Sequence, residues 1–121
     1  MAKEFSSRGW IVTGGARNKD ALEELKSELR ENYFIHPFDV TSPKDVENFS
    51  QLVMDSFGPP DLLINNAGMI NRNAPLTKIT PEEFSTILTV NLGGIHNMIR
   101  SFVPMMEKNG TGIIVNFSSY W

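Results

Sequence analysis

Short apolar runs alternate with longer amphipathic segments along the chain. A short apolar run bounded by Gly, Pro or Asn is typical of a buried strand, and such runs occur at 10–13, 33–38, 62–64 and 113–115. Apolar residues repeat with helical spacing in the segments 19–30, 43–57 and 80–106. This alternation is typical of βαβ units and a parallel sheet. The pattern therefore predicts one α/β domain over residues 1–121, with about four strands and three helices.

Two of the predicted helices open with sequences that favour a capped start. Ser42 stands three residues before Asp45, and Thr80 stands three residues before Glu83, with a proline directly after each cap. A Ser or Thr in this place accepts a backbone N–H of the first turn, and the acidic residue returns to the N–H of the cap. We therefore predict capping boxes at Ser42 and Thr80, with Asp in place of the usual Glu in the first.

Composition and charge narrow the function classes. The formal net charge is −3 and the eleven Lys and Arg residues are scattered, so no nucleic-acid partner is predicted. The chain has no cysteine, which excludes disulfides, thiolate catalysis and cysteine-based zinc sites and fits a reducing, cytoplasmic location. No apolar run approaches the length of a signal peptide core or a membrane span, so no membrane partner is expected. His36 and His96 have no partner motif, and no metal site is predicted.

Two polar or glycine-rich segments follow predicted strands directly. Thr13-Gly14-Gly15 follows the first strand, where glycines would let the backbone approach a pyrophosphate. The alternative is a simple turn, which strand-ending glycines form more often. Asn65-Asn66-Ala67-Gly68 follows the third strand, where two carboxamides and two small residues would let a ring or ribose lie close to the backbone. A polar turn is the alternative there.

Asn91 and Gly93-Gly94 interrupt the long apolar helix that begins at Thr80. Asn is a poor residue inside a helix, and each Gly costs roughly 1 kcal/mol relative to Ala. One interpretation is a helix kink or close helix packing. The other is an Asn that bends the helix and holds a water beside an active site. Ser118-Ser119 follows the last strand, at the sheet edge where open α/β sheets bind ligands, although a serine pair there is usually a turn.

The order and spacing of these motifs resemble the short-chain dehydrogenase/reductase family over nearly the whole chain. Thr13-Gly14-Gly15 resembles the start of the family's T-G-x-x-x-G-x-G loop, and Asp39-Val40 its D-V element. The segment from Asp61 to Gly68 is similar to its N-N-A-G strand, Val90-Asn91 to the helix with its catalytic Asn, and Asn116 to Ser119 to the strand with its catalytic Ser. Residues 69–73 and 118–121 are similar to aldehyde and ketone reductases of the pterin-aldehyde type.

The resemblance implies a Rossmann-like parallel sheet flanked by helices and hydride transfer between a nicotinamide cofactor and a small carbonyl or alcohol substrate. It implies that Ser119 hydrogen bonds the substrate oxygen and that Asn91 holds a water in a proton relay. The implied cofactor residues are Thr13, Gly14, Gly15, Arg17, Asp39, Val40, Asn66, Ala67, Gly68 and Val90. Arg17-Asn18 resembles the pair that follows the second strand in members that prefer NADP(H), because a guanidinium can hold the ribose 2′-phosphate.

Two departures from the family pattern predict an incomplete fold. Gly15-Ala16 runs directly into Arg17, as if the rest of the loop, a helix and a strand were deleted inside the chain. The family's Y-x-x-x-K acid/base motif does not follow Ser119, and Tyr120 is not in its place. We therefore expect impaired nucleotide binding and an inactive isolated chain. The strand at 33–38 is expected to lie beside the first strand, and the strand at 113–115 to become an exposed edge.

Three functional hypotheses follow from this interpretation. The first is an oxidoreductase of this family by descent. The second is a noncatalytic interaction module that dimerises with a copy or a full-length relative through the helix Thr80–Met106, which corresponds to a helix that family members use in dimerisation. The third is a truncated product without a stable fold.

Overall fold

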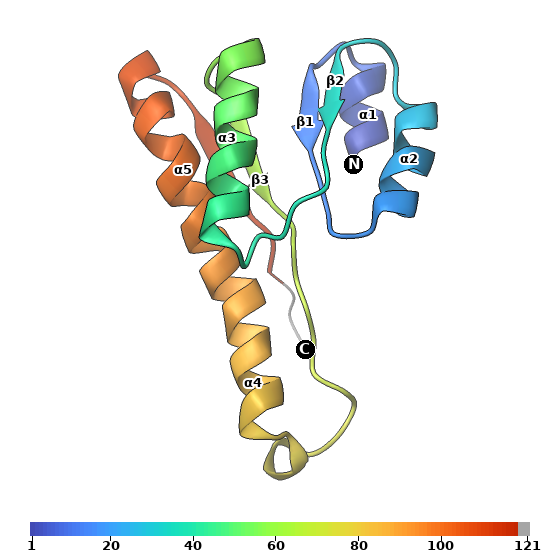
Figure 1. Cartoon of the computed structure of the whole chain (residues 1–121), viewed down its shortest axis with the longest axis vertical. Helices are drawn as coiled ribbons and strands as arrows, with labels where there is room; N and C mark the ends of the chain where they lie inside the picture. Colours follow the sequence, from blue (N-terminus) through green and yellow to red (C-terminus); the bar gives the residue numbers. More distant parts are fainter. Residues whose placement is uncertain (119–121) are drawn as a thin grey trace.

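The computed structural model describes residues 1–118 and shows short parallel strands with helices packed around them (Figure 1). In chain order the elements are α1 (Ala2–Ser7), β1 (Val12–Gly14), α2 (Lys19–Glu28), β2 (Tyr33–Ile35), α3 (Pro43–Phe57), β3 (Leu62–Asn65), η1 (Leu76–Lys78), α4 (Pro81–Leu88), η2 (Thr89–Gly93), α5 (Gly94–Asn109) and β4 (Ile113–Asn116). The α/β class and the four predicted strands are confirmed, and each predicted helix is present. The short helix α1 was not predicted.

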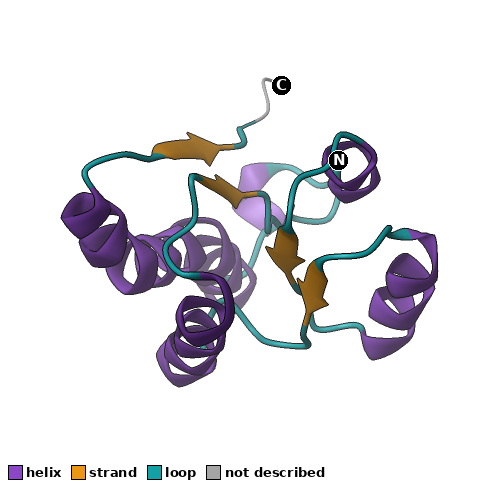
Figure 2. Cartoon of the chain, turned by 90° about the horizontal axis from the view of Figure 1, so that it is seen from above, coloured by secondary structure: helices purple, strands orange, loops and turns teal. Residues whose placement is uncertain are grey.

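The strands form two parallel pairs rather than one continuous sheet. β1 pairs with β2 from Val12↔Tyr33 to Gly14↔Ile35, which confirms the predicted neighbour of the first strand. β3 pairs with β4 from Leu62↔Ile113 to Asn65↔Asn116. No strand pairing joins β1 to β3. The predicted four-stranded sheet is therefore divided in its middle, and Figure 2 shows the two pairs as separate parts of one row.

An aromatic core lies between α3, α5 and β3. Phe49 on α3 stacks on Phe38 with ring centroids 4.3 Å apart and meets the edge of Phe102 on α5 at 6.1 Å. Val46 and Val53 on the same face of α3 are fully buried. Val46, Phe49 and Val53 belong to the predicted apolar stripe of the helix, whereas Phe57 at its end is 41% exposed. The burial of the first three side chains places α3 and α5 on one face of β3.

The first half of the chain has a thinner core. Its buried apolar side chains in β1, α2 and β2 are Leu22 and Ile35, while Trp10 and Ile11 are exposed. Helix α1 attaches to this half by the Ser6 hydroxyl, which accepts the Arg30 N–H at 2.9 Å, and by an edge contact of Phe5 on Trp10.

The predicted caps are confirmed, but the capping boxes are not reciprocal. Ser42 Oγ accepts the Asp45 N–H at 3.2 Å, and Thr80 Oγ1 accepts the Glu83 N–H at 3.1 Å. Neither acid returns to its cap. The Asp45 carboxylate accepts the Asp39 N–H, and the Glu83 carboxylate binds Arg72. Donors outside the first turns of the two helices therefore occupy both carboxylates.

The long helix predicted from Thr80 is continuous but changes its winding at Asn91. The π turn η2 joins α4 to α5, and its residues include Asn91 and Gly93. Such turns insert one extra residue into the helix and so redirect its faces. Gly94, the first residue of α5, packs on Val40, where an added Cβ would lie 2.9 Å from Val40 Cγ2. The segment therefore contains a π turn, and its close packing is against Val40 in the turn before α3, not against another helix as predicted.

Candidate functional site

A cavity of about 650 Å³ lies between the two strand pairs, and its lining includes the residues at and after the carboxyl ends of β1 and β3. Ligands of open parallel sheets bind outside these ends. All ten cofactor residues implied by the family resemblance line this one cavity: Thr13, Gly14, Gly15, Arg17, Asp39, Val40, Asn66, Ala67, Gly68 and Val90. The structure thus brings together residues from four different segments of the sequence.

The glycines after β1 serve the fold at one position at least. A Cβ on Gly15 would lie 1.9 Å from the His36 carbonyl oxygen and 2.8 Å from the Phe38 ring. Gly15 is therefore needed because the chain after β2 passes directly against it, and His36 donates its N–H to the Gly14 carbonyl at 3.0 Å. This contact supports the turn interpretation of Gly15 over a pyrophosphate loop.

Arg17 and Asp39 place one cation and one anion at the rim of the cavity. Asp39 Oδ1 accepts the Thr41 N–H at 2.9 Å and the Thr41 hydroxyl at 2.8 Å. These two bonds, with a smaller contribution from the charge of Arg17, lower the pKa of Asp39 below its usual value. Arg17 itself is exposed and forms no hydrogen bond or ion pair with residues 1–118. The rim therefore has a fixed acceptor and a cation that is open to an anionic ligand.

At the carboxyl end of β3, the buried Asn65 has a structural role, whereas the residues that follow it are exposed. Asn65 is only 6% exposed and donates from Nδ2 to Asn116 Oδ1 at 2.8 Å, so it ties β3 to β4. Its Oδ1 is buried without a partner in the part of the chain that the structure describes. Asn66 to Gly68 are exposed at the cavity mouth. The sequence motif groups these four residues together, although the alternation along β3 places Asn65 on the same buried side as Leu63.

Asn91 is directed at the backbone that follows this motif. Its Oδ1 accepts the Met69 N–H at 2.7 Å, and its Nδ2 donates to the Met69 carbonyl at 2.8 Å. Asn91 does not line the cavity, whereas its neighbour Val90 does. The π turn presents Asn91 to Met69, so the carboxamide fixes the course of the chain after Gly68.

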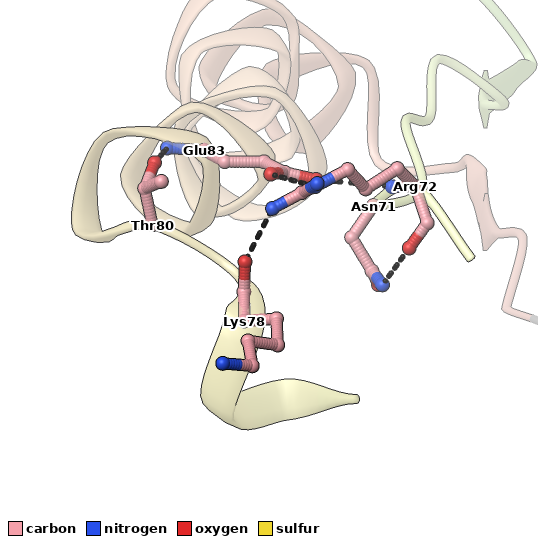
Figure 3. A network of polar contacts seen from close by, with 5 residues as sticks. All are labelled: Asn71, Arg72, Lys78, Thr80 and Glu83. Carbon is pink, nitrogen blue, oxygen red and sulfur yellow. Dashed lines mark hydrogen bonds and ion pairs between the residues drawn. The ribbon is translucent and has the colours of Figure 1, made fainter. Parts of the chain in front are cut away.

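A polar network that sequence analysis missed continues this anchorage (Figure 3). The Arg72 N–H donates to Glu83 Oε1 at 3.0 Å, Arg72 Nε donates to Glu83 Oε2 at 3.2 Å, and the guanidinium also reaches the Lys78 carbonyl. The network ties the loop after β3 to the first turn of α4. Arg72 and Glu83 are eleven residues apart across a loop. No helical or strand periodicity predicts a contact at that spacing.

Other predicted features lie outside the cavity or outside the described residues. Ser119, the implied catalytic residue, lies beyond residue 118. In residues 1–118 no group of three or more His, Cys, Asp or Glu side chains is arranged to hold a metal ion. No helix in that range is both long enough and apolar enough to cross a membrane.

Comparison with known proteins identifies the family. The family model described as short chain dehydrogenase matches residues 1–121. The chain belongs to the short-chain dehydrogenase family. It is 37% identical over 123 residues to an NADPH-dependent pterin aldehyde reductase of Arabidopsis thaliana, covering 100% of this chain and 51% of that protein. It is 32% identical over 118 residues to serine 3-dehydrogenase of Agrobacterium fabrum, covering 98% of this chain and 47% of that one.

Two solved serine dehydrogenase structures share the fold of this chain. A closed form of serine dehydrogenase complexed with NADP+ superposes with a TM-score of 0.91 at 30% identity, covering 98% of this chain and 48% of that chain. An Escherichia coli serine dehydrogenase gives the same TM-score at 30% identity, covering 98% and 54%. The chain spans about half the length of the curated relatives it matches.

The predicted deletion inside the chain is wrong. The match to the pterin aldehyde reductase covers all 121 residues within 123 residues, which leaves room for a difference of only about two positions at Ala16-Arg17 or anywhere else. A skipped helix and strand would need a far longer gap. The helix α1 before β1 and the packing role of Gly15 agree with this correction. β1 therefore corresponds to the strand that Arg17 is expected to follow, and the 121 residues contain no complete T-G-x-x-x-G-x-G sequence.

Proposed function

We propose that this chain forms the adenosine side of an NADP(H) site in an oxidoreductase that acts on a small carbonyl or alcohol substrate. The observation that carries the proposal is the gathering of Arg17, Asp39, Val40, Asn66 to Gly68 and Val90 around one cavity beside the ends of β1 and β3. The NADPH named for the pterin aldehyde reductase and the NADP+ named for the solved serine dehydrogenase support the choice of cofactor.

The residues at the rim suit the polar parts of such a cofactor. Arg17 is an exposed cation without a protein partner among residues 1–118, so it is available for the 2′-phosphate that distinguishes NADP(H) from NAD(H). Asp39 and Val40 form the wall beside the adenine. Asn66 to Gly68 leave their backbone exposed for the ribose. Thr13 and Gly14 complete the floor at the end of β1, and Val90 closes the side toward the long helix.

The chemical half of the proposal assigns roles to two further residues. When bound, the nicotinamide supplies or accepts the hydride. Asn91 holds the backbone after Gly68 through its two bonds to Met69 and so fixes the ribose side of the site. Ser119 is assigned the hydrogen bond to the substrate oxygen. Because the 121 residues contain no Y-x-x-x-K motif to transfer the proton, we expect no turnover from the isolated chain. The lack of cysteine fits a cytoplasmic protein.

Titration with NADPH and NADH tests the cofactor assignment. The purified chain is expected to bind NADPH at least about tenfold more tightly than NADH, because a charge-assisted contact to the phosphate contributes more than 1 kcal/mol. Arg17→Ala should remove this preference. Arg100→Ala, which deletes an exposed cation on α5, should leave it unchanged. Equal affinities in the unmodified chain would refute the NADP(H) preference, and an absence of binding to both would refute the site itself.

A second candidate function, dimerisation through the long helix, is favoured by its exposed apolar side chains. Phe84, Leu88 and Leu92 are 49%, 41% and 62% exposed on successive turns. Contiguous exposed apolar surface of this kind is typical of interaction sites. Sedimentation of the chain at increasing concentration should show a dimer that Leu92→Glu disrupts. The control Leu52→Glu, at an exposed position of α3, should leave the dimer intact. A monomer at all concentrations would exclude self-association through this helix.

A further inference from the structure

A tight turn before α3 places Val40 in the wall of the cavity. The Ser42 N–H donates to the Asp39 carbonyl at 3.1 Å, which is the bond of a β-turn with Val40 and Thr41 at its centre. The Asp39 carboxylate reinforces the turn by accepting the N–H and the hydroxyl of Thr41. Because the turn uses the Asp39 carbonyl, the Val40 carbonyl needs a partner from another part of the chain.

Helix α5 supplies that partner and also contacts the Val40 side chain. Asn97 Nδ2 donates to the Val40 carbonyl at 2.8 Å, across 57 positions of sequence. Gly94 stands three residues before Asn97, and a Cβ added to it would lie 2.9 Å from Val40 Cγ2 and 3.2 Å from Val40 Cβ. Residues three apart share one face of a helix. A single face of α5 therefore fixes both the carbonyl and the side chain of Val40.

Asn97 acts on the cavity only through Val40. Among the described residues that line the cavity, Val40 and Gly94 are present and Asn97 is not. A valine has few accessible χ1 rotamers, so the place of its two methyl groups follows closely from the place of its backbone. The bond from Asn97 to the Val40 carbonyl therefore determines where this part of the cavity wall lies.

The same long helix anchors the backbone on a second side of the cavity. Helices α4 and α5 continue into each other through η2 (Figure 1). Asn91 bonds the Met69 backbone in the chain after β3, and Asn97 bonds the Val40 backbone in the chain after β2. Residues six positions apart lie on different faces of a helix, so the two carboxamides hold two different segments. Asn97 thus does for the adenine side what Asn91 does for the ribose side.

We propose that Asn97 is a positioning residue for base recognition on the adenine side of the cofactor site. By fixing the Val40 carbonyl, it holds the Val40 side chain in the wall beside the adenine. The wall is then in place before the ligand arrives, so binding does not have to order it. This inference deepens the proposed NADP(H) function and rests on it. The structural alternative is that Asn97 only satisfies a carbonyl that α5 covers and has no effect on base recognition.

Two mononucleotides separate these roles. Adenosine 2′-monophosphate and cytidine 2′-monophosphate share the ribose 2′-phosphate and differ only in the base, and calorimetry measures the affinity of the full 121-residue chain for each. We expect the unmodified chain to prefer the adenine nucleotide by about fivefold, because a purine buries more apolar surface against Val40 than a pyrimidine does. Asn97→Leu removes the donor at similar side-chain size. It should lower this preference to less than about twofold, through weaker binding of the adenine nucleotide.

Matched variants separate the base from the phosphate and the structural role from the positioning role. Arg17→Ala should weaken both nucleotides alike and keep the base preference, because it acts on the phosphate that they share. His96→Ala, at the exposed neighbour of Asn97, should change neither affinity. Asn97→Gln keeps a carboxamide donor and should retain more of the preference than Asn97→Leu. Circular dichroism first establishes that each variant keeps its helices, and Asn97→Ala replaces Asn97→Leu if the leucine variant does not.

Each other outcome overturns the proposal in a recognisable way. An equal loss of affinity for both nucleotides in Asn97→Leu would give Asn97 a purely structural role. An unchanged preference in that variant, or equal binding of the two nucleotides by the unmodified chain, would mean that Asn97 does not act on base recognition, while the proposed NADP(H) function would stand. If the unmodified chain bound neither the adenine nucleotide nor NADPH, the proposed function would be refuted and this inference with it.

Discussion

The half of the molecule built from α3, α5, β3 and β4 has a continuous aromatic core, whereas the half built from α1, α2, β1 and β2 does not. Phe49 on α3 contacts the rings of Phe38 and Phe102, and this core reaches the other half through the ring of Phe34 in β2. In the other half, Leu22 and Ile35 are the buried apolar residues of β1, α2 and β2. The two halves have similar secondary structure but bury very different amounts of apolar surface.

The difference in buried apolar residues indicates that the two halves contribute unequally to the stability of the fold. Burial of apolar surface is the main stabilising contribution to folding, and regions with few buried contacts open at lower free energy than the core. Among residues 1–118, β1 pairs with β2 on one side and with no strand on the other. We therefore expect the two halves to differ in local stability, and several substitutions test this difference.

Phe49→Ala has the largest expected effect. Removing a buried Phe costs about 3–5 kcal/mol, which is most of the stability of a marginal domain, and Phe49 is 2% exposed. Urea unfolding monitored by circular dichroism should show a midpoint moved sharply downward or no folded baseline. Phe57→Ala, at an exposed ring on the same helix, is the matched control and should change the midpoint little. A midpoint of Phe49→Ala close to that of Phe57→Ala would contradict the central role of the aromatic core.

Leu22→Ala should affect the other half more locally, at a cost of about 2–3 kcal/mol. Hydrogen exchange should accelerate in β1 and β2 and remain unchanged in β3 and β4, because Leu22 lies on α2, which packs on β2. If exchange accelerated equally in both pairs, the halves would form one cooperative unit and the comparison would fail.

Much of this fold could be predicted from local patterns. The apolar stripe of α3, the caps at Ser42 and Thr80 and all four strands follow from residue spacing, because each depends on neighbours close in the sequence. The partner of β1 was also predicted. The division between the pairs was not, because strand order depends on contacts between distant segments. The same limit explains why a deletion at Ala16-Arg17 was wrongly predicted. Gly14-Gly15 resembles a phosphate-binding loop, but Gly15 is required by the close approach of the His36 backbone.

The residues that line the cavity could be inferred from the sequence motifs, but their hydrogen-bond partners could not. Family motifs indicated ten residues that line one cavity, and whether they bind a nucleotide stays a prediction. The partner of Asn91 was predicted to be a water, whereas both of its amide atoms bond Met69. The Arg72–Glu83 network could not be inferred, because it forms only when the loop folds back on α4. Side-chain partners across loops are set by the tertiary path, which no periodic pattern encodes.

Asn91→Ala is expected to have an intermediate effect, about 1–2 kcal/mol for two lost hydrogen bonds. The loss should be confined to the chain after Gly68, which has no core residues of its own to hold it. Faster exchange of the Met69 amide and earlier proteolysis within 66–73 would show this. Asn91→Asp keeps the acceptor for the Met69 N–H and loses the donor to the Met69 carbonyl. Its loss of local stability should therefore be smaller than that of Asn91→Ala. A global loss of stability equal to that of Phe49→Ala would mean that Asn91 supports the core instead.

Arg72→Ala should cost less, on the order of 0.5–1 kcal/mol, because its partners Glu83 and Lys78 lie at the surface. The expected change is faster exchange in the loop before α4, with the unfolding midpoint nearly constant. Arg72→Lys should restore little, since one ammonium cannot reproduce the forked contact with Glu83. Full recovery with Lys would show that charge alone holds the loop.

The smallest expected effect is a pH dependence from Asp39, which lies where the two halves meet. The two bonds from Thr41 lower its pKa in the folded chain, so folding favours the ionised carboxylate. Its contribution is complete above the unfolded pKa of about 3.9 and is lost as the pH falls through the lower folded value. Asp39→Asn keeps an acceptor for Thr41 but does not titrate. Unfolding free energy measured between pH 6 and pH 3 should therefore fall more steeply in the unmodified chain than in Asp39→Asn. Parallel pH profiles would mean that the carboxylate charge does not contribute to the junction, which would then rest on neutral hydrogen bonds and the packing of Val40 on Gly94.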